Sequence, residues 1–172
     1  MIFSYNNGNQ ATAFQQKNAE AYRKALEELL EIFIITYNRK KQLAATLQTL
    51  FAEKSPVRGV RFTILDNAST DGTDGLCEDY AKRYSNIRHI RHPKNIGGNA
   101  NICRAFEMAG KEYVWVLADD DGYNWSRWPQ IENAMREGYD GIFTTLLNLS
   151  RVVGPGAVLY ESCFVPGCIY RT

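Results

Sequence analysis

The chain has 172 residues, and its 20 lysines and arginines nearly balance its 19 aspartates and glutamates, which leaves a formal net charge of +1. Hydrophobic residues make up 45% and charged residues 23%, a composition that excludes a disordered or fibrous protein and fits one globular domain. The near-zero charge argues against nucleic acid as the main partner, because contact with many phosphates needs a basic excess. No apolar run approaches the roughly 18–20 residues of a spanning helix, so we expect no transmembrane segment.

The N-terminal segment MIFSYNNGNQATAFQQ has neither the basic start nor the apolar core of a signal peptide. We therefore expect a cytoplasmic protein. Four cysteines (Cys77, Cys103, Cys163 and Cys168) lack C-x-x-C spacing, and no histidine lies near the last two in sequence. This pattern favours reduced, inert thiols over a disulfide or zinc site.

Apolar periodicity predicts an opening helix followed by alternating strands and helices. Residues 11–30 carry helix formers at helical spacing, which predicts a helical extension over residues 1–30 ahead of one domain over residues 31–172. Asn38 stands where the cap of the next helix belongs. Further helices are expected at about 73–84, 100–109 and 128–136. Strands are expected at 31–36, 60–65, 87–91, 113–118 and 141–149, with another strand within 163–172.

This alternation predicts an α/β fold with a mostly parallel sheet and helices on both faces. Ligands of such sheets bind outside the carboxyl ends of the strands. The loops that follow the first four predicted strands are all polar, and two of them are acidic. They are TYNR at 36–39, DNASTDGT at 66–73, HPKNIGGN at 92–99 and DDDG at 119–122.

Three consecutive carboxylates, Asp119, Asp120 and Asp121, follow the most apolar predicted strand. Packed like charges repel, so a site that keeps them ionised needs a compensating cation. Mg²⁺ and Mn²⁺ prefer oxygen ligands and bridge carboxylates to substrate phosphates. The position favours a metal–diphosphate site over the alternative of a solvated acidic turn that caps the next helix.

The other features are less specific. Asp66 could accept hydrogen bonds from a nucleobase or ribose, although its loop also reads as an ordinary turn in which Thr70 or Asp71 caps a helix. His89 and His92 lack a nucleophile partner and are expected to be structural or surface residues. Of the tryptophans, only Trp125 is a candidate for a sugar site, and packing is the favoured interpretation for all of them.

Three segments together resemble the nucleotide-binding half of a family-2 glycosyltransferase with the GT-A fold. They are IFIITYNRKKQLAATLQTL, FTILDNASTDGT and NIGGNANICRAFEMAGKEYVWVLADDD, and the resemblance extends over about residues 31–125. It implies a Rossmann-like α/β domain. It also implies inverting transfer of a sugar from a nucleoside diphosphate sugar to an acceptor hydroxyl, assisted by Mn²⁺ or Mg²⁺.

The resemblance also implies the roles of particular residues. Asp119 and Asp121 would form the D-x-D pair, with Asp121 chiefly holding the metal and Asp119 the ribose or the metal waters. A register shift by one residue would give the metal to Asp120, which is otherwise expected at the nucleotide sugar. The remaining contacts to the nucleotide or sugar would come from Thr36, Tyr37, Arg39, Asp66 (facing the base), Asn95, Gly98 and Asn99.

The general base of this family lies well downstream of the metal motif. Few residues follow Asp121, so we expect the acceptor half to be incomplete and the base to be absent from this chain. Asp140 and Glu161 are the late acidic residues, and neither is assigned as the base. The resemblance suggests bacterial polysaccharide or glycoconjugate synthesis, with a saccharide or lipid-linked saccharide as acceptor and peripheral contact with a membrane. A second copy is an alternative partner for the apolar face of the N-terminal helix.

Two alternatives stay open at this point. The segment VWVLADDDG superficially fits a haloacid-dehalogenase-like phosphatase, with Asp119 as nucleophile and Asp121 as acid and base. The second alternative is that the chain is a non-catalytic remnant, which binds nucleotide sugars without transferring them.

Overall fold

The computed structural model describes residues 26–121, 123, 125–143, 151–153 and 168–171. The strands in these ranges are β1 (Leu30–Thr36), β2 (Arg61–Asp66), β3 (Ile87–Arg91), β4 (Tyr113–Ala118), β5 (Gly141–Phe143), β6 (Arg151–Val153) and β7 (Cys168–Arg171). The helices are α2 (Lys40–Leu50), α3 (Thr73–Arg83), α4 (Gly98–Met108) and α5 (Trp128–Arg136), with a single 3₁₀ turn, η1 (Trp125–Arg127), before α5.

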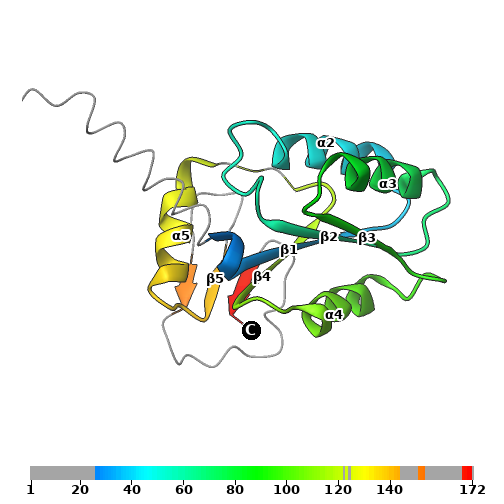
Figure 1. Cartoon of the computed structure of the whole chain (residues 1–172). Helices are drawn as coiled ribbons and strands as arrows, with labels where there is room; N and C mark the ends of the chain where they lie inside the picture. The colour runs from blue at the N-terminus through cyan, green and yellow to red at the C-terminus, as the bar shows by residue number, and fades with distance from the viewer. Residues whose placement is uncertain (1–25, 122, 124, 144–150, 154–167, 172) are drawn as a thin grey trace, which may run out of the picture.

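These strands form one sheet in the order β3-β2-β1-β4-β7-β5-β6. The first four are parallel, which confirms the predicted α/β architecture, whereas β7, β5 and β6 extend the sheet in antiparallel fashion. Figure 1 shows α2 and α3 on one face of the parallel part and α4 on the opposite face. The carboxyl ends of β1 to β4 therefore meet at one edge, as a parallel sheet requires.

Alternate residues of β1 face the two sides of the sheet and belong to two separate core clusters. Ile32 and Ile34 pack in the cluster that includes Leu47 of α2. Phe33 points to the other face and packs with Ala105 of α4. Strands buried on both faces need apolar residues at nearly every position, which is why β1 and β4 read as continuous apolar runs in the sequence.

The N-terminal boundary differs slightly from the prediction. Residues 26–29 are helical, but Leu30 already belongs to β1, and both Leu26 and Leu30 are buried in the core. The rest of the expected helical extension lies outside the described residues, so the division at residue 30 stays a prediction. At the other end, β5 ends at Phe143, and the remainder of the expected strand, residues 144–149, also lies outside them.

Cys77 and Cys103 are both free thiols. Burial, reinforced by the carboxylates of Asp66, Asp74 and Asp71, raises the pKa of Cys77 to about 12, so this thiol is inert as predicted. Within the described ranges, no helix combines the length and the apolar character needed to cross a bilayer.

The packing of α2 on the sheet predicts the effect of truncating Leu47, which is completely buried. Leu47→Ala should lower the free energy of unfolding by about 2–5 kcal/mol, because it removes buried methyl groups and leaves a cavity. Urea denaturation followed by circular dichroism measures the change. The matched control is Gln48→Ala, whose side chain is exposed on the same helix, and an equal loss in both variants would contradict the assigned face of α2.

Candidate functional site

The best-defined contact at the carboxyl edge of the sheet joins the ends of β1 and β4. Thr36 ends β1, and its hydroxyl donates a hydrogen bond of 2.6 Å to Asp119 Oδ2. The hydroxyl of Thr46 on α2 donates to the main-chain oxygen of Asp119 over 2.9 Å. The strand register places Ile35 beside Ala118, so the residues that follow them in sequence are brought together directly.

Arg39 supplies the positive charge for this contact. Its Nε lies 3.0 Å from Asp119 Oδ1, and its Nη2 forms a short ion pair with Asp120 Oδ2. Asp119 is almost completely buried, whereas the side chain of Asp120 is 47% exposed. Three predicted residues from two separate motifs, Thr36 and Arg39 from one and Asp119 from the other, therefore lie in one cluster, with Asp120 at its surface.

Asp121 turns back towards the end of β4, where its Oδ2 accepts a hydrogen bond of 3.2 Å from the Ala118 N–H. Burial raises the pKa of Asp121 above its ordinary value, and the Ala118 hydrogen bond counteracts this only in part. Burial likewise raises the pKa of Asp119, against the lowering effect of Thr36 and Arg39. Arg39 pairs with Asp119 and Asp120, and Asp121 has no ion pair among the residues that the structure describes, so the triplet is short of positive charge.

The donor set of this triplet fits a hard divalent cation. In the part of the chain that the structure describes, no three histidine, cysteine, aspartate or glutamate side chains form a ready-made metal cage. Mg²⁺ and Mn²⁺ sites at phosphates do not need one, because one or two carboxylates suffice when waters and phosphate oxygens complete the shell. Both oxygens of Asp119 already face partners, so Asp120 and Asp121 are better placed to supply ligands than Asp119.

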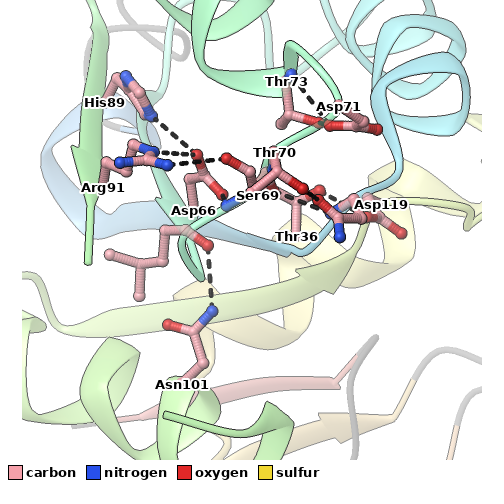
Figure 2. Close-up of polar contacts among 12 residues, drawn as sticks. Thr36, Asp66, Ser69, Thr70, Asp71, Thr73, His89, Arg91, Asn101 and Asp119 are labelled. Carbon is pink, nitrogen blue, oxygen red and sulfur yellow. Dashed lines mark hydrogen bonds and ion pairs between the residues drawn. The ribbon is translucent and has the colours of Figure 1, made fainter. Parts of the chain in front are cut away.

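Asp66 at the end of β2 lies under its loop rather than on the surface. Its carboxylate is completely buried, and Oδ1 accepts a hydrogen bond of 2.9 Å from the Ser69 N–H. Oδ2 lies 3.5 Å from Arg91 Nε and 3.9 Å from His89 Nε2, both on β3 (Figure 2). The expected contact of Asp66 with a base stays a prediction, and the structure gives this carboxylate the role of fixing the loop over residues 66–73.

The loops after β1 and β2 are locked to each other. The Asn38 N–H donates to Ser69 Oγ over 2.9 Å, and Asn38 Oδ1 accepts a 2.7 Å hydrogen bond from the Thr70 N–H. The predicted role of Asn38 as a helix cap is wrong, because α2 starts one residue later, after Arg39, and has no cap from its own flanking side chain. Asn38 adopts a positive φ of 54° instead, which directs its side chain across to the neighbouring loop.

Asp71 serves the beginnings of two helices at once. Its Oδ2 accepts a 2.9 Å hydrogen bond from the Lys40 N–H of α2, and its Oδ1 accepts hydrogen bonds from the N–H and the hydroxyl of Thr73 in α3. Desolvation raises the pKa of Asp71, but the hydrogen bonds from Thr73 and Lys40 together outweigh it, so the pKa lies below the ordinary value. Gly72, with a φ of 83°, is the N-cap of α3, so the prediction that Thr70 or Asp71 caps this helix is wrong. Asp71 lies one residue before that cap and accepts from the first residue of α3 and from the first residue of α2, which is 31 positions away in sequence.

The loop after β3 is anchored by Asn67, which the sequence analysis did not single out. Asn67 Nδ2 donates to Asn95 Oδ1, and Asn67 Oδ1 accepts from the Ile96 N–H, both over 2.8 Å. The anchored loop continues to Gly98 and Asn99, which are exposed in the first turn of α4. These two residues lie at the expected edge, and their contacts with a ligand stay predictions.

Asn101 is the second buried amide that sequence reasoning missed. Its side chain on α4 donates to the Leu65 main-chain oxygen over 3.0 Å (Figure 2). Its Oδ1 also lies 2.8 Å from His92 Nε2. An available signal was its position four residues before the buried Ala105, on the apolar face of the helix. Polar residues on such faces are hydrogen-bonded more often than not.

The aromatic residues after the triplet pack as a cluster. Trp115 and Trp128 are buried and stack with ring centroids 6.0 Å apart, as the packing interpretation predicts. Trp125 stacks on Tyr123 at 5.3 Å. Tyr37 behaves differently, since it is 44% exposed beside the site.

Comparison with known proteins identifies the family. The model of glycosyl transferase family 2 matches residues 31–155, which include all four loops described above. The chain belongs to glycosyl transferase family 2. Abequosyltransferase RfbV of Salmonella typhimurium is 31% identical over 94 residues, which are 54% of this chain and 28% of that protein. Poly(ribitol-phosphate) beta-glucosyltransferase of Bacillus spizizenii is 28% identical over 93 residues, or 54% of this chain and 15% of its relative. The family member described here therefore aligns with less than a third of either relative.

Solved structures confirm the GT-A fold. S. aureus TarS 1-349 in complex with UDP superposes with a TM-score of 0.63 at 20% identity, over 83% of this chain and 46% of that one. The mannosyltransferase PcManGT of Pyrobaculum calidifontis, solved with GDP-Man and Mn²⁺, gives a TM-score of 0.55 at 16% identity, over 79% and 43% of the two chains.

The phosphatase alternative finds no support at this site. It requires Asp119 to act as an accessible nucleophile, whereas the Asp119 carboxylate is buried and held by Thr36 and Arg39. The family match also includes the segment VWVLADDDG on which that alternative depended.

The dual role of Asp71 predicts a stability change. Asp71→Ala should lower the free energy of unfolding by about 1–2 kcal/mol, because the N–H groups of two helix starts lose their acceptor. Thermal and urea denaturation measure it. Asp79→Ala is the control, since Asp79 is an exposed aspartate of α3 with only an ion pair of 3.9 Å to Lys82. A loss no larger than that of the control would contradict the dual role of Asp71.

The partial burial of His89 predicts a pH effect. Burial lowers the pKa of His89, although the carboxylates of Asp66, Glu78 and Asp74 oppose this and Arg91 adds to it. The unfolded chain then binds the proton more readily than the folded one, so stability is lost as the pH falls below the ordinary histidine pKa of about 6.5.

Urea denaturation between pH 8 and pH 5 tests this expectation. The wild type should lose more stability on acidification than His89→Gln, which cannot take up that proton. Arg88→Gln, on the exposed side of the same strand, should behave as the wild type does. Parallel pH profiles for the wild type and His89→Gln would contradict the assigned direction.

Proposed function

We propose that this chain supplies the donor-binding half of a glycosyltransferase that moves a sugar from a nucleoside diphosphate sugar to an acceptor hydroxyl. The observation that carries the proposal is the convergence of Thr36, Arg39 and the Asp119–Asp121 triplet at the carboxyl edge of a GT-A sheet. The neighbouring structures contain GDP-Man with Mn²⁺, UDP-GlcNAc or UDP, which supports a nucleotide-sugar donor here.

In this proposal, Asp120 and Asp121 hold a divalent cation, Mn²⁺ or Mg²⁺, against the diphosphate. The bound cation would supply Lewis-acid stabilisation of the charge that develops on the leaving diphosphate. Asp119 is the positioning residue, because its buried carboxylate fixes the start of the triplet against β1. The raised pKa values of Asp119 and Asp121 support a cation at this position, since added positive charge would favour the ionised forms of both carboxylates.

The exposed groups around the triplet would bind the rest of the donor. Tyr37 presents an aromatic face beside Thr36 that suits stacking on a base. Gly98 and Asn99 lie in the first turn of α4, where the helix dipole favours anionic ligands, and Asn95 lies in the loop that leads to it. Asp66, being buried, would act on the base through the shape of its loop.

We propose inversion at the transferred sugar and a saccharide or lipid-linked saccharide as acceptor in polysaccharide synthesis. The relatives named for abequose and glucose transfer support that setting. We also propose that the protein is cytoplasmic and that it contacts either a membrane surface or a second copy of the chain.

Titration calorimetry with UDP-, GDP- and dTDP-activated sugars, each with and without Mn²⁺, tests the donor site. The wild type should bind at least one donor, and Asp121→Ala should lose the Mn²⁺-dependent part of the affinity, at least about tenfold, because a metal ligand is removed. Asp79→Ala is the control on a distant exposed position. A folded wild type that binds none of the donors would contradict the proposed function.

A further inference from the structure

Arg39 makes an unusual pair of contacts. Its guanidinium bridges two consecutive carboxylates, with Nε 3.0 Å from Asp119 Oδ1 and Nη2 on Asp120 Oδ2. No other ion pair to Asp119 or Asp120 occurs among the residues that the structure describes. Arg39 is thus the internal counter-ion of the triplet.

The contact between Arg39 and Asp119 brings opposite charges together, but its geometry is poor for a hydrogen bond. Although Arg39 Nε lies within ion-pair distance of Asp119, it is buried and makes no hydrogen bond, because its N–H is not aimed at an acceptor. A guanidinium is a planar fork that matches two oxygens of one carboxylate or phosphate, and here it is divided between two side chains. The guanidinium therefore retains hydrogen-bonding capacity that the triplet leaves unused.

The two contacts also differ in how easily they can be exchanged. Asp119 is buried, and its other oxygen accepts a hydrogen bond from the Thr36 hydroxyl, so it is fixed in place. The Asp120 side chain is 47% exposed and that of Arg39 41% exposed, so their ion pair lies in water. Exposed ion pairs contribute little free energy and exchange partners readily.

We infer that Arg39 holds Asp120 while no divalent cation is bound, releases that carboxylate when a cation arrives, and then donates to the diphosphate. This inference rests on the proposed function and adds a residue that links the two ligands. In the wild type the guanidinium competes with the cation for Asp120. Once displaced, it stands next to the site with its donors available for phosphate oxygens.

Binding of Mn²⁺ alone, measured by electron paramagnetic resonance of the free ion, tests the first half. Arg39→Gln should bind Mn²⁺ about fivefold more tightly than Lys40→Gln, the factor that corresponds to one exposed ion pair. Lys40→Gln is the matched control, because it removes the same charge from the next position, where the Lys40 side chain makes no ion pair with the described residues. Equal affinities in the two variants would overturn the inference, since only the loss of charge would then matter.

Inorganic pyrophosphate with saturating Mn²⁺ tests the second half without depending on the nucleobase. Arg39→Gln should bind it at least about fivefold more weakly than Lys40→Gln, and Arg39→Lys should recover only part of the loss, because an ammonium lacks the fork. Unchanged pyrophosphate affinity in Arg39→Gln would overturn the transfer of Arg39 to the diphosphate.

The outcomes separate this inference from the proposed function. If the wild type binds Mn²⁺ and donor sugars but Arg39→Gln matches Lys40→Gln, only the inference fails. If no variant and no wild-type sample binds Mn²⁺, the inference fails together with metal dependence, while donor binding still tests the transferase. Circular dichroism checks that Arg39→Gln is folded, which its partial exposure favours.

Discussion

The hydrogen bond between the Thr36 hydroxyl and the Asp119 carboxylate is the constraint on which the site depends. A buried carboxylate is costly unless charged or hydrogen-bonding partners replace water. Thr36 and Arg39 provide those partners; Thr36 is the last residue of β1, and Arg39 lies in the loop that follows it. The acidic triplet therefore takes its position only when β1 and β4 are paired in this register. The geometry of the site depends on the pairing of the sheet.

A second buried carboxylate repeats this arrangement one strand further out. Asp66 ends β2 and is held by the Ser69 N–H, with Arg91 of β3 near its other oxygen. The buried carboxylates of Asp66 and Asp119 both hold the loops in place, and their predicted contacts with a ligand stay predictions. Exposed neighbours such as Tyr37 and Asp120 form the accessible surface.

Local sequence predicted the parallel part of the fold well, because a strand buried on both faces leaves a continuous apolar run. β3 and β4 have the bounds that the sequence predicted, and β1 begins one residue earlier. The convergence of the polar loops also followed from the sequence, since carboxyl ends of parallel strands share an edge.

Other features could not be predicted because they arise from partners distant in the chain. The side chain of Asn38 turned towards Thr70 rather than capping its own helix, and Asp71 reached Lys40, 31 positions away. Local spacing does not specify such pairs. The antiparallel addition of β6 and β7 was equally hard to foresee, because β6 has three residues and β7 has four.

β3 ends the described order of strands, and its composition has a consequence for the behaviour of the protein in solution. The strand reads IRHIR, and Arg88 and Arg91 are exposed along it. An outer strand with unpaired main-chain groups invites other chains to add to it, and positively charged side chains discourage this by repulsion and by the cost of dehydrating them. Arg91, which lies beside Asp66, thus disfavours aggregation through this strand, and its guanidinium also supports the loop over residues 66–73.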